Sequence, residues 1–177
     1  MAAHGEKWNF SALLPFAVLA VFAFAIFFEL YLYFFTSPCV VVPRKWCSRG
    51  VPVYHENELV GIGFALPAGT RVSAPFRGVW SYTGRAVING VAYPAGGVEG
   101  SGSGSGKDLA SFIGDLALVA QSNVTVRERE LIARIPDAGE KHDGAHNLVV
   151  SFATFDPTQG YFIENRELLK TFFADIQ

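Results

Sequence analysis

The sequence predicts a single transmembrane α-helix followed by a mainly β domain with a short C-terminal helix. Three observations lead to this fold class. One block near the N-terminus is almost entirely apolar, the runs that follow alternate between apolar and polar residues, and the last segment returns to helical spacing. We therefore expect a tail at 1–12, a membrane span at 13–35, a connector at 36–50 and a β domain at 51–177.

The apolar block 13–35 reads LLPFAVLAVFAFAIFFELYLYFF. At 1.5 Å per residue it makes a helix of roughly 34 Å, enough to cross a hydrocarbon core of about 30 Å. It is longer than the apolar part of a cleaved signal peptide. A buried helix of a soluble domain is the alternative. The block therefore predicts a single-pass membrane protein.

One ionisable residue, Glu29, lies inside the predicted span. A carboxylate at this depth is costly and usually faces a partner. We therefore expect Glu29, with its neighbours Phe27 and Tyr31, to contact other membrane protein subunits. Snorkelling of Glu29 to the membrane surface is the alternative, and association with a second copy of the chain stays open.

The connector indicates contact with the lipid bilayer and gives two opposing signals about topology. Trp46 beside Arg44-Lys45 suits the headgroup zone. The count of positive charges after the span favours a cytoplasmic domain. Cys39 and Cys47 could form a disulfide in an oxidising compartment, although two free thiols or an incomplete metal pair stay open. We favour an extracytoplasmic domain.

Beyond the connector the periodicity changes to two, which is typical of β-strands. Short runs rich in Val, Phe, Tyr and Ile are separated by glycine and proline. Asn89-Gly90 predicts a tight hairpin turn. The Gly/Ser tract 96–106 predicts a flexible loop. At the C-terminus, 165–176 has apolar residues at helical spacing and Asn165 as a cap.

Two segments of the β domain, 67–82 and 123–135, resemble the two halves of a barrel-sandwich hybrid. The first contains GTRVSAPFRGVW, and the second contains NVTVRERELIARI, in which a glycine of the family pattern is missing. This fold occurs in biotinyl and lipoyl carriers and in lysostaphin-like zinc endopeptidases. The resemblance implies a small β barrel or sandwich, and it makes a zinc site worth testing.

A lysostaphin-like endopeptidase implies zinc held by two His and an Asp, with an H-x-H pair. This chain has His at positions 4, 55, 142 and 146, so it contains no H-x-H. The only candidate metal ligands are His142, Asp143 and His146, and the surrounding glycine and polar residues indicate a solvated loop. We therefore expect no cofactor and no catalytic residue. Net charge is −2 without a basic stripe, which excludes nucleic acid as a partner.

These observations favour a non-catalytic membrane-anchored accessory or assembly subunit. Such a subunit would bind neighbouring subunits of a membrane complex through its helix and its β domain, and it would not be an enzyme. The alternative is a divergent lysostaphin-like zinc endopeptidase that acts on the cell wall.

Overall fold

The computed structural model describes residues 18–28, 39–55, 57–88, 90–101, 106–137 and 145–173. The chain divides into two compact units, Met1–Ser37 and Pro38–Gln177, which are described separately.

In the first unit, residues 18–28 are helical and all of their side chains are exposed. Phe27, for example, is 70% exposed. Among the described residues, no helix combines the length and apolar character that crossing a bilayer requires. The predicted span 13–35 extends past the described helix at both ends. Glu29 and Tyr31 lie outside the described residues.

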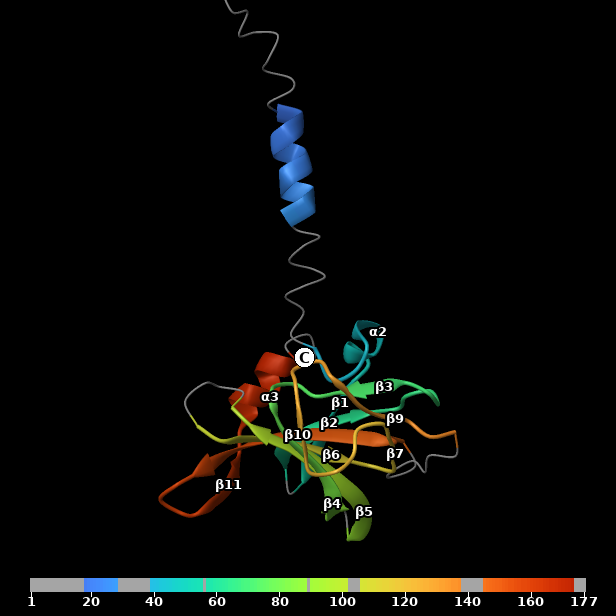
Figure 1. The fold of residues 1–177 in the computed structure, drawn as a ribbon, viewed down its shortest axis with the longest axis vertical. Coiled ribbons are helices and arrows are strands. Elements are labelled where there is room, and N and C mark those ends of the chain that lie inside the picture. Colours follow the sequence, from blue (N-terminus) through green and yellow to red (C-terminus); the bar gives the residue numbers. More distant parts are fainter. Residues whose placement is uncertain are drawn as a thin grey trace, which may run out of the picture. The chain divides into compact units, whose positions relative to one another are not determined.

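The second unit is built from two antiparallel sheets and two short helices (Figure 1). The prediction of a mainly β domain with a short C-terminal helix is thus confirmed. The large sheet has the order β1 (Val51–His55), β2 (Glu58–Phe64), β10 (Leu148–Asp156), β6 (Asp108–Ile113), β5 (Val91–Gly100), β4 (Gly78–Ile88) and β8 (Val124–Val126), with β11 (Tyr161–Glu164) beside β10. The small sheet has the order β3 (Arg71–Ser73), β9 (Leu131–Arg134) and β7 (Ala117–Leu118).

A single hydrophobic core joins the two sheets. It includes Val72 and Ile132 from the small sheet and Trp80, Phe112 and Val150 from the large one, all at 0% exposure. Successive side chains of a strand point to opposite faces, so each of these strands gives alternate residues to the core. The opposite face of the large sheet points away from this core and contains the candidate site described below.

The two segments that resemble hybrid halves pair with each other in both sheets. Arg71 of β3 is opposite Arg134 of β9, and Gly78 of β4 is opposite Val126 of β8. Between these pairings, Ala74 exchanges backbone hydrogen bonds with residues 129 and 130. Each segment therefore contributes one strand to each sheet, which ties the sheets together at this edge.

Most of the predicted connector belongs to the β domain. Val41 is completely buried, and its carbonyl accepts a hydrogen bond from the Ser73 N–H at 2.8 Å. The helix α2 (Arg44–Cys47) follows, and a disulfide joins Cys39 to Cys47 with 6.1 Å between their Cα atoms. The predicted domain boundary is corrected here, because the buried valines make this segment part of the core.

The predicted flexible loop 96–106 is wrong in its first half. Residues 96–100 complete strand β5, which pairs with both β4 and β6. Glycine is needed there because the neighbouring backbones approach closely: a Cβ at Gly100 would overlap the Arg77 carbonyl. The low-complexity composition thus reflects close strand packing. Residues 102–105 lie outside the described residues.

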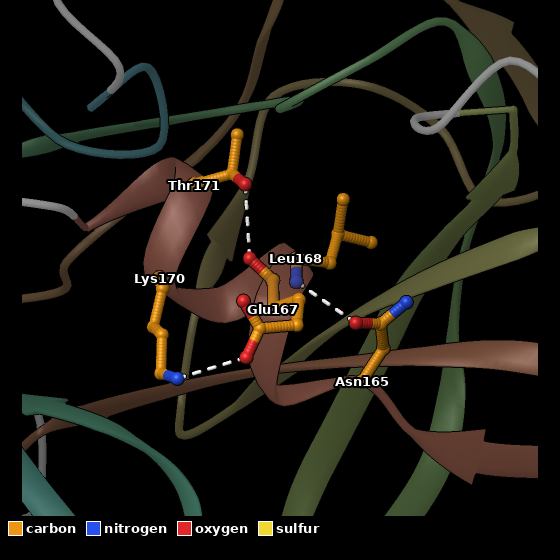
Figure 2. A network of polar contacts seen from close by, with 5 residues as sticks. All are labelled: Asn165, Glu167, Leu168, Lys170 and Thr171. Atoms are coloured by element: carbon orange, nitrogen blue, oxygen red, sulfur yellow. Dashed lines mark hydrogen bonds and ion pairs between the residues drawn. The ribbon is translucent and has the colours of Figure 1, made fainter.

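The C-terminal helix α3 (Arg166–Phe172) closes one side of the core. Asn165 caps it, with the Leu168 N–H donating to the Asn165 Oδ1 at 2.8 Å (Figure 2). On the exposed side of the helix, the Lys170 ammonium lies 2.8 Å from the Glu167 carboxylate (Figure 2). On the buried side, the Phe172 ring stacks on Phe152 at 4.8 Å. The predicted cap and helical spacing position this ring.

Candidate functional site

The outer face of the large sheet carries a straight row of four small residues. Ser151 of β10 is opposite Ser111 of β6, Ser111 is opposite Gly97 of β5, and Gly97 is opposite Ser81 of β4. Adjacent strands lie about 4.8 Å apart, so the row is roughly 14 Å long. All four residues are half-buried. We call this row the Ser/Gly floor.

Larger side chains border the floor on one side. Leu109, Glu99 and Val79 form the neighbouring row, again directly opposite one another across three strands. On the other side stand Ile113 and Arg85. The result is a groove of about 650 Å³, which is within the range typical of ligand sites. The hollow exists because the floor residues are smaller than Leu109, Val79 and Ile113 beside them.

A β-bulge in β4 shapes one end of this groove. The register shifts between Ser81 and Gly84, so that residues 82 and 83 stand opposite Gly96 alone. Bulges bend a strand and increase its twist. Beyond the bulge, β4 and β5 continue as a long hairpin (Figure 1), and Gly84, Arg85 and Ala86 line the groove. The hairpin therefore forms the second wall.

Tyr82 anchors the bulge from the core side. Its hydroxyl donates to the Gly114 carbonyl at 2.5 Å and accepts from the Leu116 N–H at 3.1 Å. Its ring stacks on Trp80 with centroids 5.9 Å apart. Burial raises the pKa of the Tyr82 phenol above its ordinary value, the Leu116 N–H partly opposes this, and the charge of Asp115 adds to it. The bulge is thus fixed by contacts opposite the groove.

Polar groups of the groove are available to a ligand. The Ser111 and Ser151 hydroxyls have no hydrogen-bond partner within the described ranges, and both line the hollow. A hydroxyl can donate one hydrogen bond and accept two. Glu99 pairs with Lys107 at 3.1 Å, and both side chains are exposed. The floor can therefore exchange hydrogen bonds with a polar chain laid along it.

The candidate metal ligands do not form a site among the residues that the structure describes. His142 and Asp143 lie outside them. The His146 ring packs against the backbone of β2, where a Cβ at Gly63 would lie 2.7 Å from its Cγ. No group of three or more His, Cys, Asp or Glu side chains within the described ranges could hold a metal. Of the three candidate ligands only His146 is described, and we derive no step through a metal.

Trp46, predicted to contact the headgroup zone of the lipid bilayer, lies on α2 between two cations. The Arg49 guanidinium is 4.8 Å and the Lys45 ammonium 5.5 Å from its ring centroid. These contacts hold the indole within its own helix and connector.

Sequence reasoning missed the Ser/Gly floor. A signal was present, because Ser111 and Ser151 each alternate with buried aromatic residues in SFI and SFA. The sequence did not reveal that these serines come into register across strands that are about 40 residues apart.

No protein-family model matches the chain, and no curated protein matches it. Among solved structures, the chain is similar to a mutant form of the catalytic domain of the prophage-encoded M23 protein EnpA from Enterococcus faecalis. The two are 15% identical, the match covers 64% of this chain and 81% of that one, and the TM-score is 0.43. It is also similar to the antimicrobial peptidase lysostaphin from Staphylococcus simulans, at 16% identity and a TM-score of 0.47, covering 69% of this chain. That match spans 48% of the lysostaphin chain. A third structure, LytU, is 17% identical, with 70% of this chain and 80% of LytU covered and a TM-score of 0.42.

These findings correct the function predicted from sequence. We expected a non-catalytic accessory subunit of a membrane complex, but two of the three structures above are described as a peptidase and as the catalytic domain of an M23 protein. The predictions of an accessory subunit and of a chain that is not an enzyme are wrong against these matches. At such identities and TM-scores, no residue role or activity passes from these proteins to this chain.

Proposed function

We propose that the β domain binds an extended peptide along the Ser/Gly floor, as the substrate-binding step of a divergent endopeptidase. The observation that carries this proposal is the four-residue register from Ser151 to Ser81 across four strands. A peptide in extended conformation rises about 3.4 Å per residue, so roughly four residues span the 14 Å row. Small floor residues let the peptide main chain come close to the serine hydroxyls.

The walls favour a peptide whose floor-facing side chains are small. Leu109 and Val79 stand above the floor on one side and Ile113 on the other. Apolar contact with these walls adds binding energy that grows with the buried area. We expect glycine and alanine to face the floor. We propose a cell-wall peptide as the substrate because two segments of the sequence resemble the halves of a lysostaphin-like fold.

The test measures binding of a capped, fluorescently labelled (Gly-Ala)₃ peptide to the full-length chain in detergent. Binding is monitored by the fluorescence anisotropy of the peptide. Ser111→Leu should fill the floor and weaken binding at least about tenfold, a loss of roughly 1.4 kcal/mol. Ser111→Ala removes one hydroxyl without filling the floor, so it should weaken binding less, by about two- to fivefold. Thr125→Leu, at an exposed position of β8 outside the groove lining, is the matched control and should bind like the wild type. Absence of binding, or equal binding by Ser111→Leu, would overturn the proposal.

Hydrolysis is tested in the same samples with added Zn²⁺. Mass spectrometry should detect cleavage products with the wild type and none with Ser111→Leu. Binding without cleavage would remove the endopeptidase part of the proposal and leave peptide binding in place.

We also propose that the apolar block 13–35 attaches the domain to the outer side of a bilayer. Its composition supports attachment, and the Cys39–Cys47 disulfide supports an oxidising compartment. The chain should stay in the membrane fraction after carbonate washing, and its cysteines should resist alkylation until a reductant is added. Release by carbonate, or labelling without reductant, would refute attachment or sidedness respectively.

A further inference from the structure

A second hollow on the outer face of the large sheet adjoins the groove. Its volume is about 200 Å³, and it shares two lining residues with the groove, Ile113 and Ser151. Ser151 is the last residue of the Ser/Gly floor on the β10 side. A peptide that runs along the floor from Ser81 therefore reaches this hollow when it passes Ser151.

The walls of the second hollow are mainly aliphatic. They include Val53 of β1, Val60 of β2, Val149 of β10 and Val87 from the β4–β5 hairpin. Val149 is 3% exposed, so the base of the hollow is well covered, whereas Val87 at the rim is 69% exposed. A methylene chain placed here would be shielded from water on several sides, and each CH₂ group buried in this way favours binding.

The rim carries a carboxylate. Glu164 of β11 lines the hollow and is exposed, and it has no ion-pair partner within the described ranges. His55 and Tyr54 from β1 complete the rim. No Lys or Arg side chain within the described ranges lines this hollow. Aliphatic walls under an unpaired carboxylate suit a side chain with an apolar stem and a cationic head.

We infer that this hollow is a subsite for a lysine-type side chain of the bound peptide. The stem lies against Val60 and Val149, and the ammonium lies near the Glu164 carboxylate. This inference rests on the proposed peptide binding and adds the class of peptide that the groove takes. It selects a substrate in which small residues are followed by one long amine-bearing residue.

The experiment compares three capped peptides in the anisotropy assay with the full-length chain. One is the (Gly-Ala)₃ peptide. In the other two, the last alanine is replaced by lysine or by norleucine, so that small residues cover the floor and the long side chain lies beyond Ser151. The lysine peptide should bind about tenfold more tightly than (Gly-Ala)₃, because its stem is buried. It should bind about threefold more tightly than the norleucine peptide, because the exposed ion pair adds little.

Glu164→Gln should remove the difference between lysine and norleucine and leave the (Gly-Ala)₃ affinity unchanged. Glu128→Gln, an exposed glutamate beside Arg129 and outside both hollows, is the matched control and should retain the difference. Equal affinity of the wild type for all three peptides would overturn the subsite while peptide binding stands. Failure of all three peptides to bind would instead overturn the proposed function itself.

Discussion

The two faces of the large sheet differ although the same strands make both. On β6, Phe112 points into the core with no exposed surface, and its neighbour Ser111 points to the groove. On β10, Phe152 and Ser151 repeat this division. Large side chains fill one face and small ones hollow the other. Because side chains alternate along a strand, one residue packs in the core and stabilises the fold, while the next lines the groove.

The largest expected effect comes from the core face. Phe112→Ala would leave a cavity next to Trp80, whose ring meets Phe112 edge-on at 5.6 Å. Loss of a buried phenylalanine costs about 3–5 kcal/mol of the free energy of unfolding. Urea denaturation followed by tryptophan fluorescence measures it. A cost below about 1 kcal/mol would show that the two faces do not differ as described.

The second effect tests the segment that covers the core ahead of β1. Replacing Cys39 and Cys47 together by alanine opens a short covalent loop around the buried Val41 and Val42. For a loop of this size the chain-entropy model gives about 2.5 kcal/mol. Reduced wild-type protein should lose the same stability as the double variant. An unchanged denaturation midpoint after reduction would mean that this segment is not held as the structure describes.

A smaller effect on stability is expected at the β4 bulge, where Tyr82 contacts on the core side fix a strand that lines the groove. Tyr82→Phe keeps the ring on Trp80 and removes the hydroxyl that bonds to Gly114 and Leu116. We expect a loss of about 1–2 kcal/mol and weaker peptide binding. Equal stability and equal binding of Tyr82→Phe would show that the hydroxyl does not fix the bulge.

The same residue predicts a dependence on pH. The pKa of Tyr82 in the fold is raised above its ordinary value of 10.0. Between the two pKa values the unfolded chain has lost a proton that the folded chain keeps, so the free energy of unfolding falls as pH rises. This contribution is complete below pH 10 and is lost above it. Tyr82→Phe should show a flatter alkaline decline in thermal denaturation from pH 9 upward, and an unchanged slope would contradict the shift.

The smallest effect comes from the groove face. Ser151→Ala should change the free energy of unfolding by less than about 0.5 kcal/mol, because a half-buried hydroxyl without a partner contributes little. The Ser151 and Phe112 variants therefore bracket the difference between the faces. A cost above about 1.5 kcal/mol for Ser151→Ala would mean that the groove face also stabilises the fold.

Much of the β domain could be predicted from the sequence, because alternation and turn residues act locally. The strands around Gly114 and the cap at Asn165 follow from neighbouring residues alone. The burial of Val41 could not be predicted, because it depends on contact with β3, which is distant in sequence.

The candidate site was harder to predict for the same reason. Its floor arises when the four strands β4, β5, β6 and β10 come into register. At residues 96–100 the composition predicted a flexible loop, whereas the chain forms part of strand β5 there. Glycines that look like a linker are required there by the neighbouring strands. A single sequence shows the alternation of Ser111 with Phe112, but it does not show which residue lies opposite Ser111.

The most direct measurement is the location of bound peptide on the two sides of the large sheet. A (Gly-Ala)₃ peptide with one photoreactive diazirine side chain would be cross-linked to the full-length chain in detergent, and the adducts identified by mass spectrometry. We predict adducts on the groove residues of β4, β5, β6 and β10, with Leu109, Ile113 and Ser151 among them, and their loss in Ser111→Leu. Adducts confined to α2, the small sheet or the β8 edge, and unchanged in Ser111→Leu, would contradict the assignment of the outer face as the binding face.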